Sequence, residues 1–256
     1  MAYSVFVGAG QWVGVADEAQ GFFGFDPEQG EWQAISEGLP ATLEVRYVAI
    51  RPDQPKTVYA GTQAGPYRSD DGGESWQALP LPAGTSEEDS VVWSICLDPN
   101  DPETVYVGTQ GTTVFRSRNS GEDWQRLAIS SPDGALKANF PMRVIRISVS
   151  NENSDHIIVA FEIGGLVRSR DGGETWESCN KALLEMTEQP HLKSAIVSDN
   201  EIEGMMDSHA LALSPRHPGT IWLANRMGLF RSDDQGTDWT EFGIGRSSPL
   251  TYARDV

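Results

Sequence analysis

The sequence predicts an all-β fold built from repeated four-stranded units, and three observations lead to this prediction. An eight-residue pattern occurs four times, with a Ser first, an Asp or Asn third, a Gly fifth and a Trp last. Each copy follows two runs of residues that favour strands, joined by turns rich in Pro, Asn or Gly. The tryptophans, counted from Trp32, recur at intervals of about 44 to 63 residues, which is typical of β-propeller blades. The four copies are Ser69–Trp76, Ser117–Trp124, Ser169–Trp176 and Ser232–Trp239.

The residues of this pattern suit a tight hairpin turn. An Asp or Asn side chain accepts hydrogen bonds from backbone N–H groups of its own turn, and Gly permits a positive φ. The Trp then opens the next strand, where its ring can be buried. We therefore expect the pattern's acids to hold turns rather than to act as catalysts, and the Arg before each copy to be structural. These residues are Asp71, Asp171 and Asp234, and Arg68, Arg116, Arg168 and Arg231.

The pattern resembles the Asp-box, or BNR, repeat of sialidase-like, sortilin-like and photosystem-II-assembly-factor-like propellers. The resemblance covers nearly the whole chain and implies a fold more firmly than an activity. Sialidases with this repeat carry an Arg-Ile-Pro-type motif in the first blade, and this sequence has none. Relatives that cleave xyloglucan use two propellers, for which this chain is too short.

Each unit is predicted to hold four short antiparallel strands, which we term a to d in chain order. Strands a are expected at 45–50, 91–97, 144–149 and 209–213, and strands b at 58–63, 105–110, 157–162 and 221–226. The first unit begins at strand b with Val5–Gly8 and has an eroded pattern, with Phe25 in place of Ser. The chain is thus expected to form one β-propeller domain over residues 1–256, with five blades.

The end of the chain leaves two arrangements open. Residues 249–256 resemble a strand a, which could complete the first blade and close a five-bladed ring without exposed sheet edges. Alternatively, the five blades are part of a longer propeller, because proteins with this resemblance usually run to more blades.

Charge and composition bear on location and partners. The formal net charge is −18, which disfavours binding to phosphate backbones and anionic lipids, so neither nucleic acid nor membrane is expected as a partner. The N-terminus lacks the layout of a signal peptide, and Cys96 and Cys179 fall in unrelated repeats. We expect a cytoplasmic, acidic protein without a cofactor.

The longest connection between blades is an insertion at 180–208, between the fourth and fifth blades counted from residue 1. Long insertions in compact domains are often functional. This one contains His191 and ends beside His209, and these are the histidines expected on the face formed by the b–c and d–a connections. Three interpretations remain open: an acid–base pair of His209 with Asp207 or Glu203, a divalent metal held by both histidines and an acid, or a solvated loop without catalytic function.

Aligning the blades places further polar residues around the axis on the same face. Arginines there could bind a carboxylate or phosphate, or could instead form ion pairs between blades. Strands a contribute Arg46, Trp93, His209 and Arg254, with Glu44, Arg143, Asp207 and Tyr252 two residues earlier, and the ends of strands b contribute Gln63, Gln110, Glu162 and Arg226.

Two functions are consistent with these residues. The first is a binding or scaffolding propeller that holds a small anionic molecule, a sugar or a protein segment on this face. The second is a hydrolase- or lyase-type enzyme at the same place, with His209 and Asp207 as acid–base groups, Glu203 nearby, and arginines that orient an acidic or sugar substrate.

Overall fold

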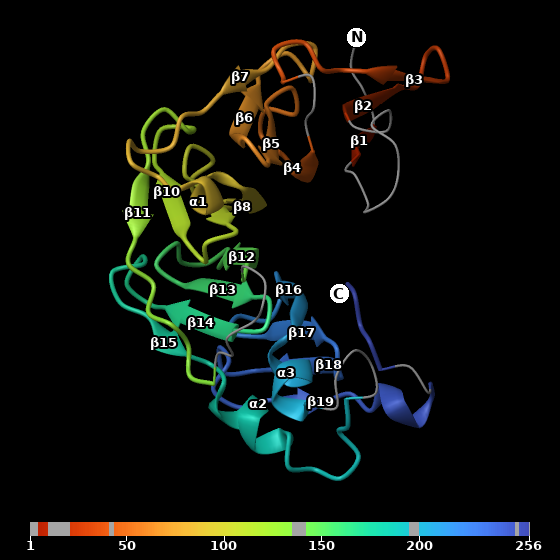
Figure 1. Cartoon of the computed structure of the whole chain (residues 1–256), viewed down its shortest axis with the longest axis vertical. Helices are drawn as coiled ribbons and strands as arrows, with labels where there is room; N and C mark the ends of the chain where they lie inside the picture. Colours follow the sequence, from red (N-terminus) through yellow and green to blue (C-terminus); the bar gives the residue numbers. More distant parts are fainter. Residues whose placement is uncertain are drawn as a thin grey trace.

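The computed structural model describes residues 5–9, 21–40, 44–134, 142–194, 200–248 and 251–255, and it confirms an all-β propeller fold. Five antiparallel sheets follow one another along the chain and form an open arc (Figure 1). Four sheets have the four strands that we predicted, whereas the first sheet has three. Each sheet pairs its strands in chain order, as expected for a propeller blade.

The elements of each blade are as follows. The first blade holds β1 (Val5–Ala9), β2 (Gly21–Asp26) and β3 (Glu31–Ala34). The second holds β4 (Val45–Ile50), β5 (Val58–Thr62), β6 (Gly65–Ser69) and β7 (Gln77–Ala78). The third holds β8 (Val92–Leu97), β9 (Val105–Thr109), β10 (Val114–Ser117) and β11 (Gln125–Leu127). The fourth holds β12 (Val144–Val149), β13 (Ile157–Phe161), β14 (Gly165–Ser169) and β15 (Glu177–Ser178). The fifth holds β16 (Ser208–Leu213), β17 (Ile221–Asn225), β18 (Gly228–Ser232) and β19 (Thr240–Glu241).

Short helices lie in the connections between blades. They are α1 (Glu87–Ser90), α2 (Lys181–Met186), α3 (Glu201–Met206) and the 3₁₀ helix η2 (Ile244–Arg246). Both α2 and α3 belong to the long connection at 180–208. Among the described residues, no helix is long and apolar enough to cross a membrane.

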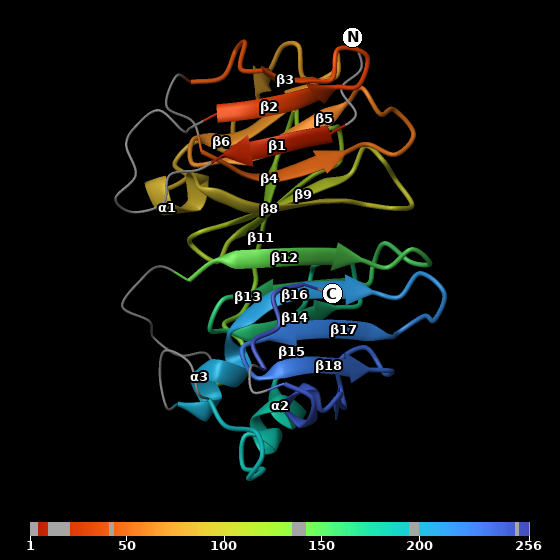
Figure 2. The ribbon, with the colours of Figure 1, turned by 90° about the vertical axis from the view of Figure 1, so that its right-hand side faces the viewer.

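The innermost strands β4, β8, β12 and β16 lie side by side along the inside of the arc (Figure 2). Small residues on one blade allow the next blade to approach closely. A Cβ atom on Gly61 would lie 2.7 Å from Val92, and one on Gly108 would lie 2.3 Å from Val144. Gly8 of β1 meets Val45 in the same way, which confirms that β1 corresponds to a strand b.

The turn predicted from the eight-residue pattern is confirmed in all four copies. In the second blade, the Ser69 hydroxyl donates to Asp71 at 2.7 Å and accepts the Gly73 N–H at 2.8 Å. Asp71 also accepts the Ser75 N–H at 2.9 Å. The corresponding bonds join Ser117, Asn119 and Gly121; Ser169, Asp171 and Gly173; and Ser232, Asp234 and Gly236. The acids therefore stabilise turns, as the sequence indicates.

The glycine of the pattern is also required by packing between blades. Gly121 has a φ of 97°, a region that L-residues with side chains rarely adopt. A Cβ there would lie 2.5 Å from Leu79 at the end of the preceding blade. The same position in the other copies faces Ile35, Leu127 and Cys179. Thus each turn is pressed against the blade before it.

The arginines that precede the turns link each blade to the next. Arg68 donates to the carbonyl of Ser120 at 2.9 Å, Arg116 donates to that of Gly172, and Arg168 donates to that of Gln235 at 2.7 Å. All three carbonyls occupy the same place in the turn of the following blade. Arg231 of the fifth blade instead pairs with Asp233 of its own blade. These residues are structural, as predicted.

The turn aspartates lead to a prediction about acid stability. Burial raises the pKa of Asp71, but hydrogen bonds from Ser75 and Ser69 outweigh it and lower the value to about 2. Hydrogen bonds from Thr175 lower the pKa of Asp171 to about 2. Because the folded pKa lies below the unfolded one, this stabilisation is complete above about pH 4 and is lost as the pH falls towards 2.

We therefore expect the free energy of unfolding, measured by urea denaturation, to fall across this pH range. Asn119 fills the same position in the third blade and still accepts the N–H of Asp123. The variant Asp71→Asn should consequently fold and show a weaker dependence on pH than the wild type. An unchanged pH dependence would contradict the assignment.

The C-terminal residues 251–253 lie against the fifth blade. The Ala253 N–H donates to the carbonyl of Asn225 at 3.1 Å, and the Thr251 hydroxyl donates to that of Arg226 at 3.2 Å. These residues form no strand with β1 within the described part of the chain. The structure is therefore an open arc, and the closed five-bladed ring that we considered is not formed. Residues 249, 250 and 256 of that predicted strand lie outside the described residues.

Candidate functional site

The two faces of the arc are those expected from the strand order. The turns of the eight-residue pattern bond to the a–b turns, for example through Gly72 N–H and the Lys56 carbonyl at 2.8 Å. On the other face, b–c turns meet d–a connections, as in the bond from Glu162 N–H to the Arg143 carbonyl at 3.0 Å. Helices α1 and α3 lie on this second face (Figure 2). We call the inner rim of this face the mouth.

A β-bulge recurs at the start of the innermost strand in four blades. The pairing register slips by one residue between Val45 and Tyr47 of β4, and at the same place in β8, β12 and β16. A bulge leaves one residue unpaired and redirects its side chain, and such bulges are frequent beside binding sites. The bulged residues are Arg46, Trp93, Ile145 and His209.

Three side chains from three blades stack at the mouth. The guanidinium carbons of Arg46 and Arg143 lie 4.2 and 4.0 Å from the centroid of the Trp93 ring. Arg46 comes from the second blade, Trp93 from the third and Arg143 from the fourth. Cation–π contacts of this kind contribute about 0.5–2 kcal/mol each. The half-buried indole is thus fixed between two arginines.

Acids and amides complete this part of the mouth. Arg46 binds Glu44 at 2.6 Å, and Arg143 binds Glu162 at 3.2 Å. The glutamine side chains also take part: Gln63 accepts the Glu44 N–H at 2.7 Å, and Gln110 accepts the Trp93 indole N–H at 3.4 Å. The arginines therefore pair with acids of their own blades, which corrects the alternative of ion pairs between blades. Arg46 and Arg143 contact a neighbouring blade through their stacking on Trp93.

The environment of Glu162 disfavours the ionised form of its carboxyl group. Burial raises its pKa, and the charge of Arg143 opposes that increase only in part. The negative charge of Asp207 on the fifth blade raises it further, whereas His209 lowers it. Charged groups of both the fourth and the fifth blades therefore influence the pKa of Glu162.

The fifth blade contributes a buried ion-pair cluster. Arg226 binds Asp207 at 2.8 Å and Glu203 of α3 at 3.0 Å, and its side chain is only 5% exposed. The Nε2 atom of His209 lies 3.4 Å from Asp207, and its Nδ1 atom lies 2.8 Å from the carbonyl of Ala253. The ring of Tyr252 packs on that of His209 with 4.4 Å between centroids, and Arg254 lies over Tyr252.

This cluster bears on the hypothesis of an acid–base pair. Burial of Asp207 disfavours its charge, but hydrogen bonds from His209 and Arg226 outweigh burial and lower the pKa of the carboxyl. Both ring nitrogens of His209 face oxygen atoms of the protein. Asp207 pairs with both His209 and Arg226, whereas Glu203 pairs with Arg226. The predicted proximity is thus present between His209 and Asp207, and Arg226 connects Glu203 to this pair.

His191 lies apart from the mouth. Its Nε2 atom is 3.4 Å from Glu241 of β19, the outermost strand of the fifth blade, whereas His209 belongs to the innermost strand. The structure therefore does not bring together the two histidines and one acid of the metal hypothesis. Within the described ranges, no group of three His, Cys, Asp or Glu residues is placed to hold a metal ion.

The residue that sequence reasoning undervalued is Trp93. It aligns with Arg46 and His209, but an aromatic residue in a strand most often belongs to a core. Its position on a bulge could be inferred only from the pairing register. The alignment of the blades could have identified Trp93, since the equivalent position holds a polar residue in the second and fifth blades.

Comparison with known proteins agrees with this architecture. The Sortilin-Vps10 family model, described as sortilin, neurotensin receptor 3, matches residues 64–187, just under half of the chain. This region holds three of the four eight-residue patterns, with the turn geometry described above. The chain is an Asp-box β-propeller. No curated protein sequence matches it.

Solved structures similar to this Asp-box propeller share its fold at low sequence identity. An ancestral GH74 enzyme is 19% identical with a TM-score of 0.58, over 81% of this chain and 24% of that one. YCF48 from Cyanidioschyzon merolae is 14% identical with a TM-score of 0.56, over 79% of this chain and 57% of that one. The extracellular domain of the hybrid two-component system BT3049 from B. thetaiotaomicron is 14% identical with a TM-score of 0.57, over 86% of this chain and 27% of that one. This chain thus corresponds to between about a quarter and somewhat more than half of each.

Proposed function

We propose that this Asp-box propeller is a binding or scaffolding protein that holds a protein segment at the mouth. The observation that carries the proposal is the stack of Arg46, Trp93 and Arg143, which three different blades present on bulged or adjoining positions. Tryptophan and arginine are the residues most often found at the energetic centres of protein interfaces. A stack fixed before binding also loses little conformational entropy when a partner binds.

The charges around the stack favour a protein segment over a small anion. Arg46, Arg143 and Arg226 are each paired with a carboxylate, at 2.6, 3.2 and 2.8 Å. A small anion would have to compete with these carboxylates for the arginines, because the positive charge of each arginine is already paired. Its binding is therefore disfavoured. A protein segment can instead pack on the partly exposed indole and bond to polar groups along the rim, such as Gln63 and Gln110.

The proposal is tested with a phage-displayed library of linear peptides selected on the immobilised chain. We expect selected peptides to bind the wild type and to lose at least about ten-fold in affinity for Trp93→Ala, as is usual for an interface tryptophan. Circular dichroism and thermal unfolding would establish that this variant is folded. Affinities would be measured by isothermal titration calorimetry.

The matched control is Trp32→Ala. Trp32 is 52% exposed and lies on β3, the outermost strand of the first blade, away from the mouth. Peptides that bind the mouth should keep their affinity for this variant. Equal affinity for the wild type and Trp93→Ala, or a larger loss in Trp32→Ala, would overturn the proposal.

A further inference from the structure

Neighbouring blades meet along a seam, and each blade contributes the same positions to it. The blade that follows contributes two alternate residues of its strand b, which have 0% exposure in the second to fifth blades. The blade that precedes contributes the residue three positions after its Trp, which is 3–4% exposed in the first to fourth blades. The strand-b residues are Val58 and Ala60, Val105 and Val107, Ile157 and Val159, and Ile221 and Leu223. The residues after the Trp are Ile35, Leu79, Leu127 and Cys179.

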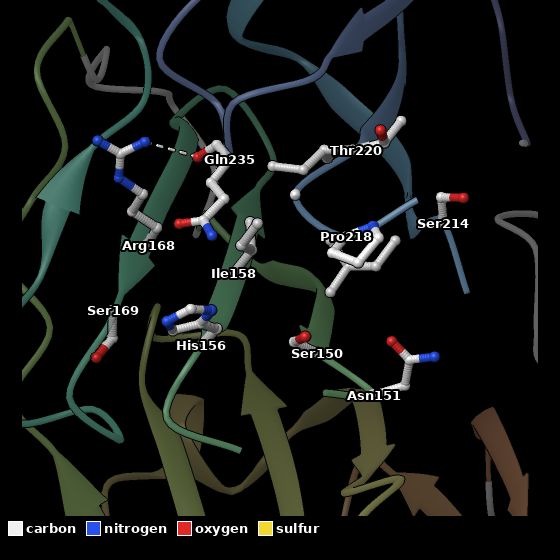
Figure 3. A pocket seen from close by; sticks show the side chains of 13 residues that line it. Ser150, Asn151, His156, Ile158, Arg168, Ser169, Ser214, Pro218, Thr220 and Gln235 are labelled. Atoms are coloured by element: carbon white, nitrogen blue, oxygen red, sulfur yellow. Dashed lines mark hydrogen bonds between the residues drawn. The ribbon is translucent and has the colours of Figure 1, made fainter. Parts of the chain in front are cut away.

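Figure 3 shows such a seam between the fourth and fifth blades. Ile158 and Arg168 come from the fourth blade, and Gln235 comes from the pattern turn of the fifth. Arg168 donates to the Gln235 carbonyl at 2.7 Å, and Ile158 packs in one apolar cluster with Ile221 and Leu223. The cavity left beside these side chains has a volume of only about 30 Å³. This seam is therefore closed by apolar packing and by an arginine of the preceding blade.

The first blade exposes the half of a seam that would meet a preceding blade. Its strand-b residues Val5 and Val7 are 46% and 44% exposed, although their equivalents in the other blades are buried. Trp32 is 52% exposed, and its ring centroid lies 5.3 Å from that of Phe25. We call Val5, Val7, Phe25 and Trp32 the front face.

The fifth blade exposes the other half, which would meet a following blade. Phe242 is the residue three positions after the Trp of this blade, and it is 47% exposed. Its ring centroid lies 4.9 Å from that of Trp222, which occupies the position of the buried residues Tyr59 and Tyr106. Arg231 lies over Trp222 and occupies the position of the arginines that reach the next blade. We call Trp222, Arg231 and Phe242 the rear face.

The front and rear faces lie on the blades at the two ends of the arc (Figure 1). Four of the six large apolar residues that are exposed in the described part of the chain belong to them. The terminal units of repeat proteins usually carry a polar outer face, which keeps the proteins soluble. Exposed apolar faces at both ends instead indicate a surface that binds another protein.

The two faces complement each other in charge as well as in apolar residues. Residues 21–34 of the first blade include the exposed acids Glu28 and Glu31 and contain no Lys or Arg. The rear face contributes the cation of Arg231, which pairs with Asp233 of its own blade at 2.7 Å. Arg68 makes the same pair within its blade and still donates to the next one. The pair with Asp233 is therefore compatible with a bond from Arg231 to a following blade.

We propose that the front face of one copy of this chain docks on the rear face of a second copy, so that the chains associate head to tail. The strand-b valines of the front face would pack on Trp222 and Phe242. Arg231 would donate to the carbonyl of Glu28, which has the same place before its Trp as the acceptors in the other seams. Such a contact closes into a ring or continues as a filament. It lies away from the mouth and does not rest on the function proposed there.

Sedimentation velocity of the full chain over a concentration series tests the proposal. We expect the wild type to form complexes of two or more chains. Trp32→Lys on the front face and Phe242→Lys on the rear face should each weaken association at least about ten-fold, because an exposed aromatic residue is lost from the contact. The matched control is Ile50→Lys, since Ile50 is 44% exposed on β4 of the second blade and belongs to neither face. Circular dichroism would establish that all three variants are folded.

A mixture of the two interface variants tests the head-to-tail arrangement. Trp32→Lys keeps an intact rear face, and Phe242→Lys keeps an intact front face. Their equimolar mixture should give complexes of two chains and none larger, because the two remaining faces are blocked. The proposal is overturned if the wild type is monomeric throughout the series, or if either folded variant alone associates as strongly as the wild type. A mixture that stays monomeric, or an equal loss in Ile50→Lys, would also overturn it.

Discussion

Replacement of Asp207 by alanine is expected to lower the free energy of unfolding by about 3 kcal/mol or more. The Arg226 side chain is 5% exposed, and Asp207 accepts its hydrogen bonds at 2.8 and 3.0 Å. Removal of this carboxylate takes away the buried acid that pairs with the guanidinium, whereas Glu203, its other acidic partner among the described residues, is 25% exposed. A buried charge without its partner is costly, because the desolvation of the charge is no longer offset. Urea denaturation at neutral pH measures the loss.

A matched control and a rescue make this prediction specific. Asp233→Ala removes a carboxylate that pairs with Arg231, but Asp233 is 60% exposed, so the expected loss is much smaller than for Asp207→Ala. The double variant Asp207→Ala with Arg226→Met should recover most of the lost stability, since it removes the buried charge together with its partner. Equal losses for Asp207→Ala and Asp233→Ala would show that Arg226 reaches water easily.

Arg116→Ala is expected to cost about 3 kcal/mol, or about 6–12 °C in Tm. Arg116 is 5% exposed and donates to the carbonyl of Gly172 in the next blade and to Gln125 of its own blade at 2.8 Å. Truncation removes charge-assisted bonds and leaves a buried carbonyl without this donor. It also opens a cavity in the seam between the third and fourth blades. Differential scanning calorimetry measures the change in Tm.

The control for this prediction is Arg231→Ala in the fifth blade. Arg231 occupies the same position in its repeat, but its bonds stay within the blade, to Asp233 at 2.7 Å, and it lies over Trp222. The expected loss is under about 1 kcal/mol, because the pair is exposed. If both variants lost stability equally, the link between blades would not be the source of the effect.

The repeat itself could be predicted because its chemistry is local. Each turn brings together a Ser, an acid or amide, a Gly and a Trp within eight residues, and the hydrogen bonds from Ser69 to Asp71 and Gly73 follow from that spacing. The alternation of strands and turns then orders the blades, and equal strand positions place residues such as Arg46 and His209 near one axis.

Other features of the site could not be predicted, because they depend on how neighbouring blades are rotated against each other. Whether Arg143 stacks on Trp93 is decided by a side chain of another blade, about fifty residues away. The distance between His191 and the mouth depends on the path of the insertion around the fifth blade, where the ring pairs with Glu241. Neither this stacking contact nor this distance can be derived from the spacing of residues in the sequence.

The sequence by itself therefore determined the all-β repeat, the turn chemistry, the face on which polar residues gather and most residues of the mouth. Only the tertiary structure decided that the arc is open, that the mouth's arginines pair within blades, and that Phe242 is exposed at one end of the arc. The physical reason is the range of the interactions. Turn hydrogen bonds act within a few residues, whereas stacking, buried ion pairs and seam packing depend on surfaces that meet only after the blades have assembled.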